Sequence, residues 1–274
     1  MRLLVAGSET PDEREARREG AGASSAETYA ETLRDLRPGA SIDIVSCVDD
    51  DAEPNVWDLA RYDAVFFAGS PLQMQDETTE ARRAARFMEG VFEAGVPAFG
   101  SCAGLQIAAV AAGGTCRPRQ PRMEAAFARR ITATEAGRAH PLLAGRPAAW
   151  DAPAMHSSEI VDLPPGATVL ASTRTTPVQA IEIRRGNGVF WGVQYHPELT
   201  LAEIAASLRR QAEDLVEERL ATNKAAVETY AGFIDALDRD SGRRDLAWQL
   251  GLDDEVLLPE RRMTEIRNFL DRFA

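Results

Sequence analysis

Residues 96–106, with the sequence VPAFGSCAGLQ, are the stretch that decides the fold class. Their apolar start at 96–99 is typical of a short buried strand, and the alanine-rich segment 105–112 that follows is typical of a helix. Between the two lies a tight turn, Gly100-x-Cys102-x-Gly104. The order of strand, turn and helix predicts a nucleophile elbow, in which Cys102 is held exposed between a sheet and a helix.

Further apolar runs on the N-terminal side of this turn alternate with helical segments. The runs at 3–6, 42–48 and 64–68 predict strands, and 26–36 and 77–94 have the spacing and composition of helices. Strands and helices that alternate in this way form a mostly parallel sheet with helices on both faces. We therefore predict an α/β fold. The carboxyl ends of its strands, where ligands bind in such sheets, carry both Gly69 and Cys102.

Residues 131–194 have a different character, rich in β-prone residues and punctuated by proline and glycine. The runs 180–185 and 189–195 flank Gly186-Asn187-Gly188, and a turn of this composition predicts a β-hairpin. The second hairpin strand is expected to run directly into His196-Pro197-Glu198.

From residue 201 onward, apolar residues recur at helical spacing. The sequence thus predicts a domain over 1–200 and a C-terminal helical extension over 201–274. Near the other end of the chain, Gly20-Ala21-Gly22 lies in a polar segment and is interpreted as a flexible loop. Phosphate-binding loops of the G-x-x-x-x-G-K-[ST] type are absent from the sequence.

Composition excludes several classes of partner and site. The 274 residues carry a formal charge of −12, and Lys224 is the only lysine, which argues against nucleic-acid binding. The sequence lacks an apolar run near the roughly 20 residues that span a bilayer, so we predict a cytoplasmic protein without membrane contact. The three cysteines and three histidines show no metal-ligand spacing, so we predict no metal and no cofactor.

Acyl transfer by a thiolate requires a base that also protonates the leaving amine, and His196 is the best candidate. Glu198 lies two residues on, and in extended chain residues i and i+2 project to the same face, so its carboxylate can orient the imidazole. The structural alternatives are a small buried cysteine on a turn and a strand-end histidine beside a surface carboxylate. Cys47 and Cys116 lack the elbow setting and are predicted to be structural.

The other two histidines receive weaker interpretations. His140, in a loop before proline, is predicted to be a surface residue. His156, which precedes Ser157 and Ser158, either lines a pocket or makes a turn.

Residues 100–106 (GSCAGLQ) and 192–198 (GVQYHPE) together resemble the two signature blocks of class I (triad) glutamine amidotransferases. Gly69-Ser70-Pro71 is similar to the glycine-containing oxyanion loop of that family. The resemblance covers about residues 1–200 and is closest to stand-alone proteins related to the glutaminase domain of GMP synthase. It implies a flavodoxin-like three-layer sandwich.

The resemblance also implies a γ-glutamyl thioester on Cys102, with His196 moving the proton and Glu198 orienting His196. The backbone N–H groups of Gly69 and Ala103 would form the oxyanion hole. Substrate contacts would come from Ser70, Gln106, Ser157 and Ser158. Leu105 and Ala103 differ from the residues usual in the elbow, which leaves the substrate open while the thiol chemistry is retained.

Several functions stay open at this point. The first is hydrolysis of glutamine to glutamate and ammonia for a separate synthase; the second is hydrolysis of γ-glutamyl amides or peptides without a synthase, as in the plant γ-glutamyl peptidases. A third is a non-catalytic regulatory subunit. Related cysteine-elbow folds with chaperone or deglycase-like roles are disfavoured by the block 196–198. The C-terminal helices are open between a packed cap, a homodimer contact and a docking face for a synthase.

Overall fold

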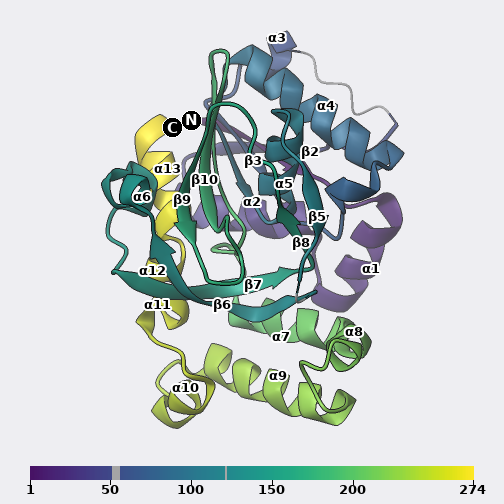
Figure 1. The fold of residues 1–274 in the computed structure, drawn as a ribbon, viewed down its shortest axis with the longest axis vertical. Helices are drawn as coiled ribbons and strands as arrows, with labels where there is room; N and C mark the ends of the chain where they lie inside the picture. Colours follow the sequence, from purple (N-terminus) through teal and green to yellow (C-terminus); the bar gives the residue numbers. More distant parts are fainter. Residues whose placement is uncertain (51–55, 121) are drawn as a thin grey trace.

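The computed structural model describes residues 1–50, 56–120 and 122–274 (Figure 1). Its strands are β1 (Arg2–Gly7), β2 (Ser41–Ser46), β3 (Ala64–Phe67), β4 (Ala98–Ser101), β5 (Cys116–Pro118), β6 (Glu124–Ala133), β7 (Ala149–His156), β8 (Ser158–Ile160), β9 (Ala167–Ser172), β10 (Ala180–Arg185) and β11 (Gly188–Val193). Its helices are α1 (Pro11–Ala21), α2 (Ser25–Leu36), α3 (Val56–Leu59), α4 (Thr79–Ala94), α5 (Ala103–Ala111), α6 (Glu135–Ala139), α7 (Leu201–Arg210), α8 (Ala212–Glu217), α9 (Lys224–Arg239), α10 (Arg244–Leu250), α11 (Asp254–Leu257), α12 (Pro259–Arg262) and α13 (Thr264–Phe273), with single 3₁₀ turns η1 (Met74–Asp76) and η2 (Pro141–Leu143).

A nine-stranded sheet with the order β2-β1-β3-β4-β11-β10-β9-β6-β7 forms the centre of the molecule. The strands from β2 to β11 pair in parallel, and those from β11 to β7 pair antiparallel. β10 and β11 are the predicted hairpin. β5 and β8 form a separate two-stranded sheet. The carboxyl end of β4 thus lies beside that of β11, which brings the two sequence blocks together.

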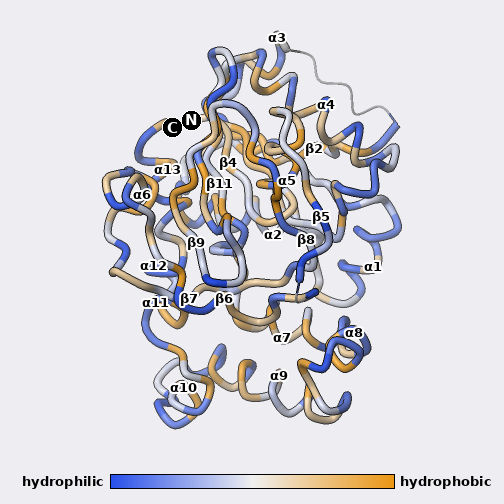
Figure 2. The backbone as a smooth tube through the Cα atoms, viewed as in Figure 1, coloured by the Kyte–Doolittle hydropathy of each residue, from blue (hydrophilic) through white to orange (hydrophobic). Residues whose placement is uncertain are grey.

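Helices cover both faces of the parallel half of the sheet. Alternate residues of a strand point to opposite faces; accordingly, Leu3 of β1 packs in one apolar cluster with α2 and α13, whereas Leu4 packs in another with α4 and α5. Figure 2 shows the central strands as hydrophobic and α1, on the outside, as largely hydrophilic. The predicted α/β three-layer sandwich is confirmed.

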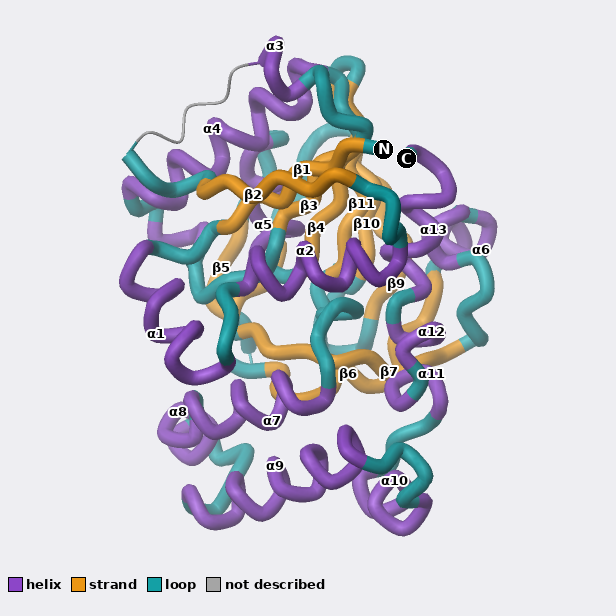
Figure 3. The backbone as a smooth tube through the Cα atoms, turned by 180° about the vertical axis from the view of Figure 1, so that it is seen from behind, coloured by secondary structure: helices purple, strands orange, loops and turns teal. Residues whose placement is uncertain are grey.

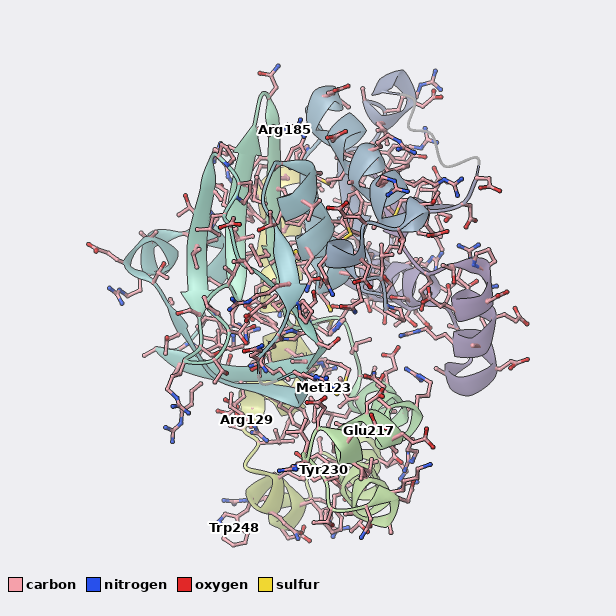
Figure 4. The ribbon with its side chains drawn as sticks, turned by 45° about the vertical axis from the view of Figure 1, so that its right-hand side comes forward. Met123, Arg129, Arg185, Glu217, Tyr230 and Trp248 are labelled. Atoms are coloured by element: carbon pink, nitrogen blue, oxygen red, sulfur yellow. The ribbon has the colours of Figure 1, made fainter. Side chains whose placement is uncertain are left out.

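The C-terminal segment packs against two different parts of the fold. Apolar residues of α7 to α11 form a third cluster against Phe127 of β6. Arg129, on the same strand, donates to the carbonyls of Leu250 and Gly251 at the end of α10, and Figure 4 shows it between the sheet and these helices. α13 instead returns to the main sheet (Figure 3), where the Phe269 ring lies 5.3 Å from that of Phe66. The division at residue 200 stays a prediction.

The interpretation of Gly20-Ala21-Gly22 as a flexible loop was wrong. Gly20 and Ala21 are the last residues of α1, and Gly22 is its left-handed C-cap, with φ 84°. Thr10 and Glu13 form a capping box at the other end of the helix. α1 carries no apolar side chain larger than alanine after Pro11, so its sequence has no apolar periodicity, and none of its residues is fully buried.

The second hairpin strand ends earlier than predicted, at Val193 rather than at Tyr195. The Val193 carbonyl accepts the N–H of Cys102 at 2.8 Å, and the His196 N–H donates to Pro153 at 2.7 Å. The chain therefore leaves the sheet where its neighbour β4 ends and turns toward β7. Among the described residues, no helix is both long and apolar enough to cross a membrane.

Candidate active site

Cys102 lies at the junction of β4 and α5 in a strained backbone conformation, with φ 52° and ψ −108°. Such positive φ values in non-glycine residues cluster at functional sites. The flanking glycines permit the turn: a Cβ on Gly104 would lie 2.5 Å from the Phe67 carbonyl oxygen, and one on Gly100 would lie 2.8 Å from the backbone of Gly104. The predicted order of strand, turn and helix is present, with β4 before Cys102 and α5 after it. The prediction of an exposed Cys102 was wrong: its side chain is buried, with 5% of its surface accessible.

His196 and Glu198 meet in the loop after β11. The Nδ1 atom of His196 lies 2.7 Å from Oε1 of Glu198, and both side chains are buried. Neither residue is on a strand, so their contact comes from the turn at Pro197 rather than from the predicted extended chain. Because Nδ1 faces the carboxylate, Nε2 is the ring nitrogen left for another partner.

Two neighbouring side chains, Glu198 and Cys102, shift the pKa of His196. Burial lowers the pKa of His196, but the charge of Glu198 and the charge and hydrogen bond of Cys102 outweigh it and raise that pKa to about 10. Burial raises the pKa of Cys47 and that of Cys116 to about 12, which disfavours a thiolate at either position. Cys102 is therefore the cysteine whose surroundings suit a nucleophile.

Gly69 lies against the same two side chains. A Cβ at this position would come within 2.5 Å of His196 Cε1 and 3.5 Å of Cys102 Cβ. The Gly69 carbonyl accepts the Ser25 hydroxyl at 2.5 Å, and the Ser25 N–H donates to Glu9 at 2.9 Å, which fixes the loop to the start of α2. Ala103 is the first residue of α5, so its N–H has no acceptor within the helix. Both Gly69 and Ala103 border the pocket at Cys102.

The predicted substrate residue Gln106 is buried and bonded within the protein. Its Nε2 donates to the Ser158 carbonyl and to Gln194 Oε1, both at 3.1 Å. The Ser158 hydroxyl donates to Gln75 Oε1 at 2.5 Å. Ser157 is half-buried and lines the same pocket. These bonds shape the pocket wall, and the contacts of the three residues with a substrate stay predictions.

Ser70 is likewise hydrogen-bonded within the protein. Its hydroxyl lies 2.7 Å from the Ser8 hydroxyl and accepts the Leu72 N–H at 3.2 Å. It also lines the pocket, so a contact with substrate stays a prediction for Ser70 as well.

The remaining histidines are more buried than their local sequence indicates. His156 lines the pocket: its Nδ1 lies 2.9 Å from the Ser158 carbonyl and its Nε2 lies 2.9 Å from Glu124. The surface prediction for His140 was wrong. Its ring packs edge-on against Trp191, 4.6 Å between centroids, because the loop that carries it folds back onto the sheet.

The pocket at Cys102 has a volume of about 440 Å³, within the roughly 300–1,000 Å³ range of small-molecule sites. One of its walls consists of α1, α7 and α8, which lie side by side in Figures 1 and 3. Glu9, Arg17 and Arg210 line this part of the pocket, and none of them was predicted. They belong to no motif, so only the tertiary fold reveals them.

Comparisons with known proteins identify a family and several relatives. The sequence model of the family described as glutamine amidotransferase class-I matches residues 21–212. A γ-glutamyl-L-1-hydroxyisopropylamide hydrolase from a Pseudomonas species is 35% identical over 221 residues, which cover 79% of this chain and 74% of that protein. A GMP synthase (glutamine-hydrolysing) from Leifsonia xyli is 35% identical over 139 residues, 51% of this chain but only 26% of the synthase.

The fold has solved counterparts. A glutamine amidotransferase from Thermotoga maritima superimposes with a TM-score of 0.64 at 15% identity, covering 99% of this chain and 97% of that one. At this identity the likeness shows the fold alone. The matches in sequence to the family model and to the hydrolase establish the wider relationship: this chain belongs to the class I glutamine amidotransferase family.

Proposed function

We propose that this protein hydrolyses the γ-glutamyl amide bond of a small substrate through a thioester on Cys102. The observation that carries the proposal is the 2.7 Å contact of His196 Nδ1 with Glu198 in a pocket that Cys102 and His196 both line, where both side chains lie against Gly69. A cysteine, a base and a carboxylate that orients the base form the constellation of nucleophilic acyl transfer.

The chemistry follows from the placement of these groups. Cys102 Sγ attacks the γ-carbonyl carbon while its proton passes to His196 Nε2, and the N–H groups of Gly69 and Ala103 stabilise the negative oxygen that forms. His196 then protonates the amide nitrogen, the C–N bond breaks, and an amine leaves. Water attacks the thioester and gives its proton to His196. Glutamate departs, and the proton returns to the sulfur.

The identity of the leaving amine separates two candidates. An amine larger than ammonia is favoured by the Pseudomonas hydrolase, whose match extends over most of both chains, and by a pocket that continues from Cys102 to α7 and α8. Glutamine as substrate, with ammonia passed to a separate synthase, is supported by the GMP synthases, which match about half of this chain. We propose γ-glutamyl amides of larger amines as the preferred substrates.

The test is a comparison of substrates with the purified full chain. Release of ammonia from glutamine is measured beside release of amine from a panel of γ-glutamyl amides and peptides. We expect higher kcat/KM on the panel, loss of turnover in Cys102→Ala, and retained turnover in the matched variant Cys116→Ala. A preference for glutamine would favour the synthase-coupled candidate, and turnover that survives in Cys102→Ala would refute the thioester mechanism.

A further inference from the structure

We propose that Arg210, supported by Arg17, binds an anionic group on the amine half of the substrate. The preferred substrates would then be γ-glutamyl amino acids or peptides, whose leaving amine carries a carboxylate. This inference rests on the proposed γ-glutamyl amide hydrolysis and names its substrate class.

The position of Arg210 suits the leaving group rather than the glutamyl group. Gln106 and Ser158, the predicted glutamyl contacts, lie on α5 and β8, whereas Arg210 ends α7 and lines the same pocket from the wall shared with α1. Its side chain crosses to α1, where a Cβ on Gly20 would lie 3.8 Å from Arg210 Cδ. Arg210 is also exposed, so it stands where the pocket opens to solvent and where an amine can depart.

The guanidinium of Arg210 is available to a ligand. Its Nη2 donates to the Ser207 hydroxyl at 2.8 Å, and in the described part of the chain no carboxylate oxygen lies within 4.0 Å of its nitrogens. A guanidinium presents a planar fork of N–H donors that matches a carboxylate. Arg210 therefore retains donors that a bound anion can accept.

Arg17 adds a second positive charge beside it. Arg17 and Arg210 line the same pocket. Burial, followed by the charge of Arg17, lowers the pKa of Arg210, and the charges of Glu9 and Glu203 act in the opposite direction. Arg17 itself interacts with Glu203 at 3.4 Å and with Glu9 at 3.8 Å. An anion on Arg210 would relieve the repulsion between the two guanidinium groups.

The carboxylates that border the pocket are a competing feature, because they could instead attract a cationic amine. Two of them are already occupied within the protein: Glu9 accepts the Ser25 N–H at 2.9 Å, and Glu13 accepts the Thr10 N–H at 2.8 Å in the capping box of α1. Asp214 is exposed on α8 and is the remaining acidic group of the wall. Hydrogen-bonding capacity thus favours an anion at Arg210, and a cationic substrate is the rival outcome.

The experiment compares γ-glutamylglycine with γ-glutamylglycinamide, two amides of similar size that differ in the charge at the far end of the amine. We expect the wild type to have the higher kcat/KM for the acid. In Arg210→Gln the ratio of the two kcat/KM values should fall about tenfold, the effect of losing one charge-assisted hydrogen bond at an exposed site. Arg209→Gln is the matched control, because Arg209 lies on the same helix but pairs with Glu228 and Asp235; it should keep the wild-type ratio.

The other possible results separate a failure of the anion site from a failure of the proposed function. Equal kcat/KM for the two substrates in the wild type, or an unchanged ratio in Arg210→Gln, would overturn the anion site while leaving the hydrolase in place. A preference for a γ-glutamyl diamine would overturn it in favour of Asp214. Hydrolysis of neither substrate nor of any other γ-glutamyl amide would instead refute the proposed function, and the inference with it.

Discussion

The hydroxyl of Tyr195 donates a hydrogen bond to Glu265 at 2.8 Å, which joins the residue before His196 to the C-terminal helix α13. Glu265 is fully buried and also accepts two bonds from Arg146, at 2.7 and 2.6 Å. Glu255 binds the same guanidinium at 2.7 Å. The loop of the proposed base is therefore held by a buried ionic network between the sheet and the end of the chain.

Breaking that network should destabilise the fold. Glu265→Gln leaves the buried Arg146 with one carboxylate instead of two, and removal of one partner from a buried ion pair costs about 3 kcal/mol or more. We expect a fall of about 3 kcal/mol in the free energy of unfolding, measured in urea. Glu260→Gln, an exposed change on α12, should cost little. Equal stability of the two variants would show that the network contributes little.

Gly69 should tolerate no side chain. In Gly69→Ala the new Cβ would overlap His196 Cε1, so either the imidazole or the loop must move away from Cys102. Displacement of a catalytic group by about 1 Å costs on the order of 100-fold in rate, and we expect kcat to fall by about that factor. Gly39→Ala is the control, since nothing lies within 4 Å of a Cβ there. Near-wild-type kcat in Gly69→Ala would contradict the close approach of Gly69 to His196.

The raised pKa of His196 makes a prediction about pH and stability. Folding raises this pKa from 6.5 to about 10, so the folded state binds the proton more tightly than the unfolded state. The stabilisation is fully present below pH 6.5 and is lost as the pH rises through 10. Relative to His196→Gln, the wild type should lose stability across that window, with a slope of at most about 1.4 kcal/mol per pH unit. Urea unfolding of both proteins between pH 6 and 10 measures it, and a constant difference would contradict the shift.

Those parts of the site that depend on the spacing of neighbouring residues, such as the turn at Cys102, could be predicted from the sequence. The elbow follows from the glycines on either side of Cys102, since their need for close backbone approach is a property of the turn itself. Resemblance to the family's two signature blocks predicted that Cys102 and His196 belong to one site. In the structure, the strands that precede them, β4 and β11, pair side by side.

Other features could not be foreseen because they arise from tertiary contacts. α1 has no large apolar residue and so lacks an apolar stripe, and its ends are defined by the capping box of Thr10 and Glu13 and by the left-handed Gly22. The pocket wall that carries Arg17 and Arg210 forms where α1 meets α7, two segments far apart in sequence. His140 was predicted at the surface because it lies in a loop before proline, and the ring that covers it, Trp191, lies on the distant strand β11.

Ser25 should act as a positioning residue for the oxyanion loop. Its hydroxyl donates to the Gly69 carbonyl at 2.5 Å, and the Cα of Gly69 lies beside Cys102 and His196. In Ser25→Ala the carbonyl loses its partner and the loop is free to rotate, which should weaken the stabilisation of the transition state more than the binding of the substrate. We therefore expect kcat to fall about tenfold with KM changed little, because one of the two proposed oxyanion donors becomes misaligned.

Ser25→Thr is the matched control for this change, since it keeps a hydroxyl at the start of α2. It should recover most of the lost kcat, whereas a merely structural role would show itself as a lower unfolding temperature in Ser25→Ala with kcat retained. Steady-state kinetics on one γ-glutamyl amide and thermal unfolding of the three proteins distinguish these outcomes. A fall in kcat that Ser25→Thr does not reverse would mean that the shape of the site around Ser25, rather than its hydrogen bond to Gly69, controls the loop.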